Sequence, residues 1–212
     1  MLEGVHDLPL FIAAGLLLNI TPGADLALIG ARSAGQGFRS GAAAALGVGA
    51  GCFVHVAAAA LGLSALIASS AAAFTVLRWV GAAYLVWLGI GLLRGGGEPA
   101  SAAAAMPAVT WWRSFAQGFL TNALNPKVAL FFLAFLPQFI DAAAPHKALS
   151  FIALGAVFAV NGTLVNVAFA GLIAGLRGAL GSQPAIGRWL RRGVGALFVA
   201  LGVRLAGFDG GH

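Results

Sequence analysis

The chain has 212 residues, of which 60% are hydrophobic and 8% are charged, and its formal net charge is +6. Soluble domains carry about one quarter charged residues, so this chain has too little polar surface to cover a water-soluble globule. The twelve Lys and Arg residues lie mostly between apolar runs, which indicates membrane topology and argues against nucleic acid as a partner. The single cysteine, Cys52, excludes an intrachain disulfide and a redox relay built on cysteine pairs.

Six apolar runs follow one another along the chain, and each can cross about 30 Å of hydrocarbon as a helix. They cover residues 8–30, 41–67, 74–93, 115–140, 148–176 and 193–208. The last run is short and contains Arg204. The pattern predicts an all-α integral membrane protein with six transmembrane helices. The first run follows an acidic stretch with Glu3 and Asp7, so we expect it to be retained as a span and not cleaved as a signal.

The stretch from residue 95 to 108 reads GGGEPASAAAAMPA, a composition that is typical of a flexible linker. It divides the chain into two halves with three spans each. The predicted organisation is therefore a first three-helix repeat over residues 1–94, a linker loop over 95–114 and a second three-helix repeat over 115–212.

The basic residues between the spans predict the orientation in the membrane. Eight of them fall on one side and at most three on the other. The eight are Arg32, Arg39, Arg94, Arg113, Arg177, Arg188, Arg191 and Arg192, and the three are Arg78, Lys147 and Arg204. Because cytoplasmic loops carry the excess of Lys and Arg, both termini are predicted to lie on the non-cytoplasmic side of the inner membrane.

The two halves of the chain are similar in sequence. LNITPGADLAL around Pro22 matches NALNPKVALFF around Pro126, and LGVGAGCFVHVAAAALGL matches LGAVFAVNGTLVNVAFAGL. The stretch from Arg78 matches the stretch from Arg192 with one gap. Because each half has an odd number of spans, the second copy enters the membrane from the opposite side, which predicts a 3+3 inverted repeat, a transporter architecture. Chance similarity between Ala-, Gly- and Leu-rich helices is the alternative.

Proline within a membrane helix frees a backbone carbonyl, and this is tolerated where the broken helix is buried in protein or lines a cavity. Pro22 and Pro126 at matching places therefore predict that the first and fourth spans are broken helices that face each other. A helix that restarts with either proline as its first residue would point unpaired N–H groups at an anion such as a carboxylate. Gly23 would let a ligand approach the backbone closely. A plain proline kink is the alternative.

Asp25 and Lys127 are the carboxylate and the amine that lie well inside apolar runs, each close to one of the two prolines. Each costs a few kcal/mol in the membrane unless it is paired or hydrated. The simplest interpretation is a mutual ion pair across the repeat axis. The functional interpretation is that Asp25 binds an ammonium group or carries a proton, while Lys127 holds a carboxylate.

Other polar residues of the spans are candidates for the same site. Asn19, Thr21, Asn122 and Asn125 lie beside the two breaks, and they can cap freed backbone groups or contact a ligand. His55 in the second span and Asn161, Thr163 and Asn166 in the fifth fall in equivalent helices. For His55 the alternatives are a proton relay and hydrogen bonding between helices. The pairs Gly47 with Gly51 and Gly171 with Gly175 predict packing faces.

Four segments together resemble the LysE/RhtB family of amino-acid exporters. They are NITPGADLAL, GFRSGAAAALGVGAG, LRWVGAAYLVWLGIGLLR and FAQGFLTNALNPKVALFFLAFLPQFI, in this order and spacing over essentially the whole chain. The resemblance implies a six-span inner-membrane transporter that exports neutral or basic amino acids, or homoserine and threonine, driven by a proton or ion gradient. Asn19, Thr21, Pro22, Gly23 and Asp25 correspond to the first motif, and Asn125, Pro126 and Lys127 to the second. Ala24 stands where the family often has a second proline, which would soften the first break.

The residues and the resemblance lead to one hypothesis, a secondary exporter of small amino acids that works by alternating access. A zwitterionic substrate would place its carboxylate at a broken helix or Lys127 and its ammonium group near Asp25. The expected partners are the amino acid, protons or another coupling ion, and lipid, and a homodimer is left open. An exporter of small cations or metal ions is the alternative. The sequence has no motif for a catalytic residue, a cofactor or a resident metal, so an enzyme is not expected.

Overall fold

The computed structural model describes residues 4–63, 76, 79, 83, 86, 90, 108–141 and 143–176. All the helices described here lie within these ranges. The predicted third span, apart from five isolated positions, and the predicted sixth span lie outside them. The same is true of most of the predicted linker, so the complete 3+3 arrangement is a prediction that the described residues do not test.

The first predicted span is a pair of helices with a bend of 55° between them, α1 (Leu8–Ile20) and α2 (Ala24–Gln36). Pro9 lies in the first turn of α1, where its missing N–H leaves no hydrogen bond unmade. Between the two helices the chain is extended from Thr21 to Gly23. The second helix begins at Ala24, so Pro22 precedes its cap and is not its first residue as the sequence predicted. It also ends at Gln36, six residues beyond the expected end of the span.

Next comes α3 (Phe38–Ala58), which continues as a π-helical turn, η1 (Ala59–Leu63). It packs against α6 (Trp111–Ala123), which starts at the Thr110 cap inside the predicted linker. A Cβ atom at Gly47, Gly51 or Gly118 would overlap backbone atoms of the facing helix, so these glycines allow the two backbones to touch. The predicted packing role of Gly47 and Gly51 is therefore confirmed.

The fourth predicted span is also bent, by 46°, where α6 ends and α7 (Pro126–Leu130) begins. Here Pro126 is the first helical residue, as predicted. The chain continues as a π-helical turn, η2 (Phe131–Phe135), and a 3-10 turn, η3 (Leu136–Phe139). This change of helix type occurs next to Pro137, which has no N–H to donate to a regular α-helix.

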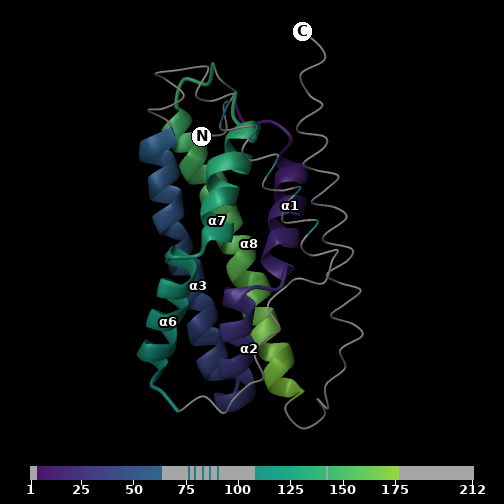
Figure 1. The fold of residues 1–212 in the computed structure, drawn as a ribbon, viewed down its shortest axis with the longest axis vertical. Coiled ribbons are helices and arrows are strands. Elements are labelled where there is room, and N and C mark those ends of the chain that lie inside the picture. The colour runs from purple at the N-terminus through teal and green to yellow at the C-terminus, as the bar shows by residue number, and fades with distance from the viewer. Residues whose placement is uncertain are drawn as a thin grey trace.

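The last described helix is α8 (Lys147–Gly175), an apolar helix that runs the full length of the molecule (Figure 1). The second glycine pair, Gly171 with Gly175, does not form a close packing face with the described helices, because none of their atoms lies within 4 Å of a Cβ built at Gly175. Within the described residues, two helices are long and apolar enough to span a membrane, or four spans if each bent pair counts as one. The chain is a multi-pass helical membrane protein.

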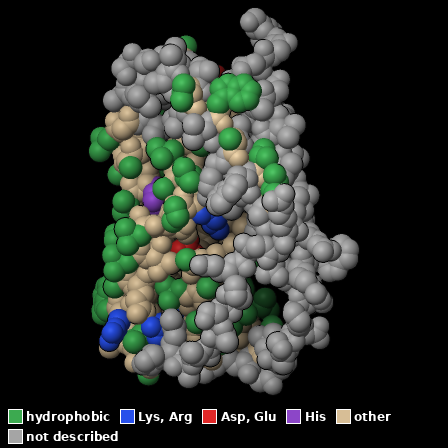
Figure 2. All heavy atoms as spheres, viewed as in Figure 1, with side chains coloured by type: hydrophobic (Ala, Val, Ile, Leu, Met, Phe, Trp, Pro, Cys, Tyr) green, Lys and Arg blue, Asp and Glu red, His purple; other side chains and the backbone are tan. Residues whose placement is uncertain are grey.

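The two bent pairs run in opposite directions (Figure 1). In that view α1 lies above α2 and α7 lies above α6, so both breaks fall near half height, with α3 and α8 alongside. Above the breaks lies a cluster of stacked and edge-on rings whose centroids are 4.8 to 6.2 Å apart. These rings belong to Phe11, Phe131, Phe132, Phe135, Phe139 and Phe158. Hydrophobic side chains are also spread over the described side surface, while Lys and Arg show at its lower end and in one patch near half height, beside an acidic patch (Figure 2).

Candidate functional site

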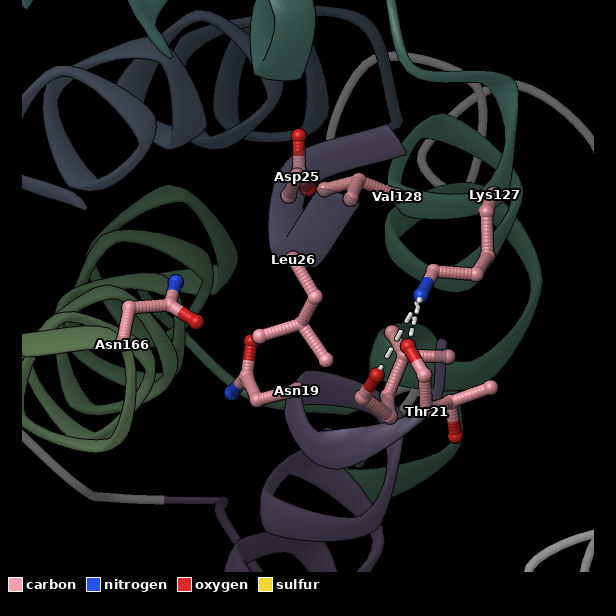
Figure 3. A pocket seen from close by; sticks show the side chains of 8 residues that line it. Asn19, Thr21, Asp25, Leu26, Lys127, Val128 and Asn166 are labelled. Carbon is pink, nitrogen blue, oxygen red and sulfur yellow. Dashed lines mark hydrogen bonds between the residues drawn. The ribbon is translucent and has the colours of Figure 1, made fainter. Parts of the chain in front are cut away.

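The two breaks are connected to each other by side chains that come from the first turn after each break. Asp25 of α2 accepts hydrogen bonds at Oδ2 from the side-chain amides of Asn122, at 3.0 Å, and Asn125, at 2.9 Å. Lys127 of α7 donates from Nζ to the backbone carbonyls of Leu18, at 3.3 Å, and Thr21, at 3.2 Å (Figure 3). Each half of the structure thus binds the interruption of the other half.

These contacts are equivalent in the two halves. Leu18 and Thr21 lie four residues and one residue before Pro22, and Asn122 and Asn125 lie four residues and one residue before Pro126. The acceptors for Lys127 are main-chain carbonyls at the end of α1. The Leu18 carbonyl has no regular α-helical bond, because Pro22 has no N–H, and it accepts from the N–H of Thr21, at 3.2 Å, as well as from Lys127. The partners of Asp25 are side-chain amides in the same two positions of the other half.

The predicted ion pair between Asp25 and Lys127 is wrong, because neither forms a salt bridge within the described part of the chain. Amide groups bind the carboxylate and carbonyl oxygens bind the ammonium group, so each charge is partly solvated by neutral dipoles. Because the two charged groups do not pair with each other, both remain able to bind a third group. Gly23 is the residue that makes this possible on one side, since a Cβ atom there would lie 3.2 Å from Lys127 Nζ. The protein's own ammonium group, and not a ligand, occupies the space beside Gly23.

The residues beside the breaks also cap them. Asn125 accepts at Oδ1 from the backbone N–H of Lys127, at 3.0 Å, which is the standard N-cap of α7. Thr21 donates its hydroxyl to the carbonyl of Leu17, at 2.6 Å. His55 of α3 lies 2.9 Å from the carbonyl oxygen of Asn122, and because a carbonyl only accepts, Nε2 carries the hydrogen. This is the helix-to-helix hydrogen bond that was one of the two alternatives for His55, and a proton relay remains a prediction.

Two small cavities lie on this site, each with a volume of about 10 Å³. The first, called here the charged cavity, is lined by Asn19, Asp25 and Lys127 among others, and the second, called the apolar cavity, lies between α3 and α8. Asn19 and Asn166 line both (Figure 3). A water molecule needs a cavity of about 10 to 15 Å³, so each holds about one water and neither holds an amino acid. The site is closed in this structure.

Several polar atoms around the two cavities are buried and have no hydrogen-bond partner among the described residues. They are Asn19 Nδ2, Asp25 Oδ1, Asn122 Oδ1 and Asn166 Oδ1. Buried polar groups are normally paired, and each that is not costs about 1 to 3 kcal/mol. Asp25 Oδ1 and the Asn122 and Asn166 oxygens are acceptors, so they match a ligand with several N–H groups. Buried polar atoms that stay unpaired while the site is closed, at a cost in stability, are typical of a binding site.

The sequence offered Asn161 and Asn166 of α8 as candidates, and the structure places only the second at the cavities. Asn161 is half-buried and lines neither cavity, whereas Asn166 is 3% exposed and lines both. Five residues on a helix correspond to a rotation of about 140°, so the two side chains point in different directions. The feature that distinguishes Asn166 is that it lies on the face of α8 that packs on the first break. Asn19, Thr21, Asp25, Lys127 and the capping asparagines all lie where the two breaks meet, as expected.

At the lower end of the molecule, α2, α3 and α6 are joined by a second polar group, called here the Arg32 network. Arg32, 3% exposed, donates to the side-chain oxygens of Gln36, at 3.1 Å, and Gln117, at 2.7 Å. Ser40 donates to the same oxygen of Gln36, at 3.0 Å, and its hydroxyl lies 2.8 Å from that of Ser114. The sequence treated Arg32 only as a marker of topology and did not predict this network.

The described residues contain no group of three His, Cys, Asp or Glu side chains that is close enough to hold a metal ion. The polar atoms that converge on the cavities are amide, carboxylate and ammonium groups. These groups bind hydrogen-bonding organic ions well, and they lack the soft ligands that transition metals prefer.

Comparison with known proteins identifies the class as membrane translocators. Residues 16–207 match the model of the LysE type translocator family, and the chain belongs to this family, which confirms the resemblance found in the sequence. An uncharacterized membrane protein of Pseudomonas aeruginosa is 32% identical over 96% of both chains. The homoserine/homoserine lactone efflux protein of Salmonella typhi is 31% identical over 92% of this chain and 94% of its own. The leucine efflux protein of Salmonella typhimurium is 28% identical over 96% of both chains. No solved structure gives a significant match.

Proposed function

We propose that the protein is a secondary transporter that exports amino acids across the cytoplasmic membrane by alternating access. The observation that carries the proposal is the reciprocal connection of the two breaks through Asp25 and Lys127, with unpartnered polar atoms facing closed cavities beside it. The family supports export as the activity, and relatives named for the efflux of homoserine and leucine support amino acids as the substrate.

The substrate would bind as a zwitterion between the two breaks. Lys127 has three N–H groups and uses two of them on carbonyls, so it can offer the third to the substrate carboxylate. Asp25 uses one carboxylate oxygen on amides, and its other oxygen is free for the substrate ammonium group. Asn19 and Asn166 line the same cavity as the two charges and would complete the contacts. The protein thereby exchanges its own dipoles for those of the substrate.

Alternating access follows from the arrangement around the breaks. The 3+3 inverted repeat would place the same bent helix in opposite orientations, with Pro22 and Pro126 as the cause of the two bends. The described bent pairs, which run in opposite directions, support it. The Arg32 network would close the path at one end, and the phenylalanine cluster above the breaks would close it at the other. Opening toward one side requires only one of these two closures to separate.

The end that carries Arg32, Arg39 and Arg113 would face the cytoplasm, with both termini on the other side. Export would then begin with separation of the Arg32 network, which admits the substrate, and end with separation of the aromatic cluster, which releases it. Protonation of Asp25 is the proposed coupling step, because a neutral carboxyl group would no longer attract the substrate ammonium group.

The test is efflux of a panel of labelled amino acids from proteoliposomes, with and without a proton gradient. Asp25→Asn and Lys127→Ala should both abolish saturable efflux while the proteins still insert. The matched controls are Asp141→Asn and Lys147→Ala, since these residues lie in and after the loop that follows η3, away from the breaks. Gradient-driven efflux that survives in Asp25→Asn would overturn coupling through Asp25. Absence of efflux for every amino acid in the wild type would overturn the proposed function itself.

A further inference from the structure

The apolar cavity adjoins the charged cavity, and the two share Asn19 and Asn166 as lining residues. Its other walls come mainly from small or hydrophobic residues of α3 and α8, including Val48, Gly49, Cys52 and Phe158. No Asp, Glu, Lys or Arg is among the described residues that line it. An uncharged compartment thus adjoins the place where the two charges lie.

Two glycines let polar side chains lie against the wall of this compartment. A Cβ atom on Gly49 would overlap the hydroxyl oxygen of Thr163, which is fixed by its hydrogen bond to the carbonyl of Ala159, at 2.7 Å. A Cβ atom on Gly162 would lie 2.8 Å from the side-chain oxygen of Asn19. The two glycines therefore determine where the Thr163 hydroxyl and the Asn19 side chain lie on this wall.

Few hydrogen bonds from the described residues hold Asn19 and Asn166, the two residues at the boundary between the cavities. Asn19 Nδ2 and Asn166 Oδ1 are buried, and neither has a hydrogen-bond partner among the described residues. Asn122 Oδ1, on the wall of the apolar cavity, is buried and unpartnered in the same way, and the Asn122 side chain is 3% exposed. Rotation of Asn19 and Asn166 toward a ligand would satisfy these atoms and join the two cavities, without breaking a hydrogen bond that either side chain now makes.

We propose that the apolar cavity receives the side chain of the transported amino acid, and that it selects small uncharged side chains. This rests on the proposed function, in which the charged cavity holds the α-carboxylate and α-ammonium groups. A lysine or glutamate side chain would bring a further charge into a compartment whose described walls offer no counter-ion, so it should be rejected. Gly49 and Gly162 set the size limit, and both act as specificity-determining residues.

The first experiment compares wild type with Gly49→Ala in proteoliposome efflux of alanine, leucine and lysine. Wild type should export the two neutral amino acids and discriminate against lysine by at least about tenfold. Gly49→Ala should lower kcat/KM for leucine by about tenfold more than for alanine, since the added methyl group overlaps the Thr163 hydroxyl and pushes this side chain into the compartment. Gly62→Ala is the matched control, because no atom of the described residues lies within 4 Å of a Cβ built there.

Binding can be measured separately from transport, because Cys52 lines the apolar cavity and is the only cysteine in the sequence. Cys52 is 3% exposed, so maleimide labels it when the site opens, and in detergent a neutral amino acid at ten times its Kd should slow this labelling about tenfold, by occupancy alone. In Gly49→Ala, alanine should still protect Cys52 at this concentration and leucine should not. Labelling also shows whether the variant is folded. An unfolded variant would be labelled as fast as wild-type protein that has been denatured in detergent.

Equal loss of alanine and leucine transport in Gly49→Ala, or wild-type efflux of lysine as fast as leucine, would overturn the side-chain subsite while leaving amino-acid export intact. Failure of every amino acid to protect Cys52 in a wild type that transports them would overturn it as well. Absence of both efflux and protection for all amino acids would instead mean that the proposed function has failed.

Discussion

Truncation of the two asparagines that bind Asp25 gives a quantitative test of the connection between the breaks. Asn122→Ala removes one hydrogen bond, from Nδ2 to Asp25 Oδ2, and leaves the backbone carbonyl that His55 binds. Asn125→Ala removes the equivalent bond and also the N-cap of α7. The two side chains are 3% and 7% exposed, so water does not readily replace either group.

The expected magnitudes follow from these contacts. A hydrogen bond between membrane helices contributes about 0.6 kcal/mol on average, and a charged partner roughly doubles this, so Asn122→Ala should cost about 1 kcal/mol. Loss of an N-cap adds about 1 kcal/mol, which makes Asn125→Ala cost about 2 kcal/mol. For a chain of this length, 1 kcal/mol lowers Tm by about 2 to 4 °C. The Tm should therefore fall by about 2 to 4 °C in Asn122→Ala and by about 4 to 8 °C in Asn125→Ala.

The assay is thermal unfolding in detergent, followed by tryptophan fluorescence. Asn125→Ser, which keeps a capping oxygen but cannot reach Asp25, should behave like Asn122→Ala. Asn161→Ala, an asparagine truncation outside the site, is the control and should change Tm little. In an Asp25→Ala background the cost of Asn122→Ala should largely disappear. Equal costs for Asn122→Ala and Asn125→Ala, or an undiminished cost in the Asp25→Ala background, would refute the reasoning.

Three further predictions concern the packing, the site and the lower closure. Gly118→Ala should cost about 1 to 3 kcal/mol by forcing α3 and α6 apart, while Gly62→Ala should be nearly neutral, and a Tm for Gly118→Ala equal to that of wild type would contradict this. In the proteoliposome assay, Asn166→Ala should reduce efflux at least about tenfold, and Asn161→Ala should not. The reverse order would assign the role in the site to Asn161 instead. Arg32→Lys should weaken the lower closure by about 1 kcal/mol, because lysine cannot bind two side-chain oxygens in the same geometry. A membrane-impermeant thiol reagent should then label the single cysteine about fivefold faster than in wild type. Unchanged labelling would exclude the Arg32 network as a closure.

The sequence alone determined the class of protein and the location of the candidate site. Apolar length and low charge are properties of short windows, and they suffice to identify membrane helices. Pro22 and Pro126 mark the places where the helices are interrupted, because proline lacks a backbone donor wherever it lies. The Asn125 cap and the close approach at Gly47 are equally local, since they depend on one residue and the helix around it. The family could also be assigned from these motifs.

Only the tertiary structure decided which groups meet. Attraction between opposite charges suggested that Asp25 and Lys127 would pair, but the side-chain amides of Asn122 and Asn125 bind the carboxylate, and backbone carbonyls at the end of α1 bind the ammonium group. The choice of Asn166 over Asn161, and the clustering of Arg32 with residues of α3 and α6, depend on how each helix is rotated about its axis. Rotation is set by packing between segments about 100 residues apart, which no local window of the sequence contains.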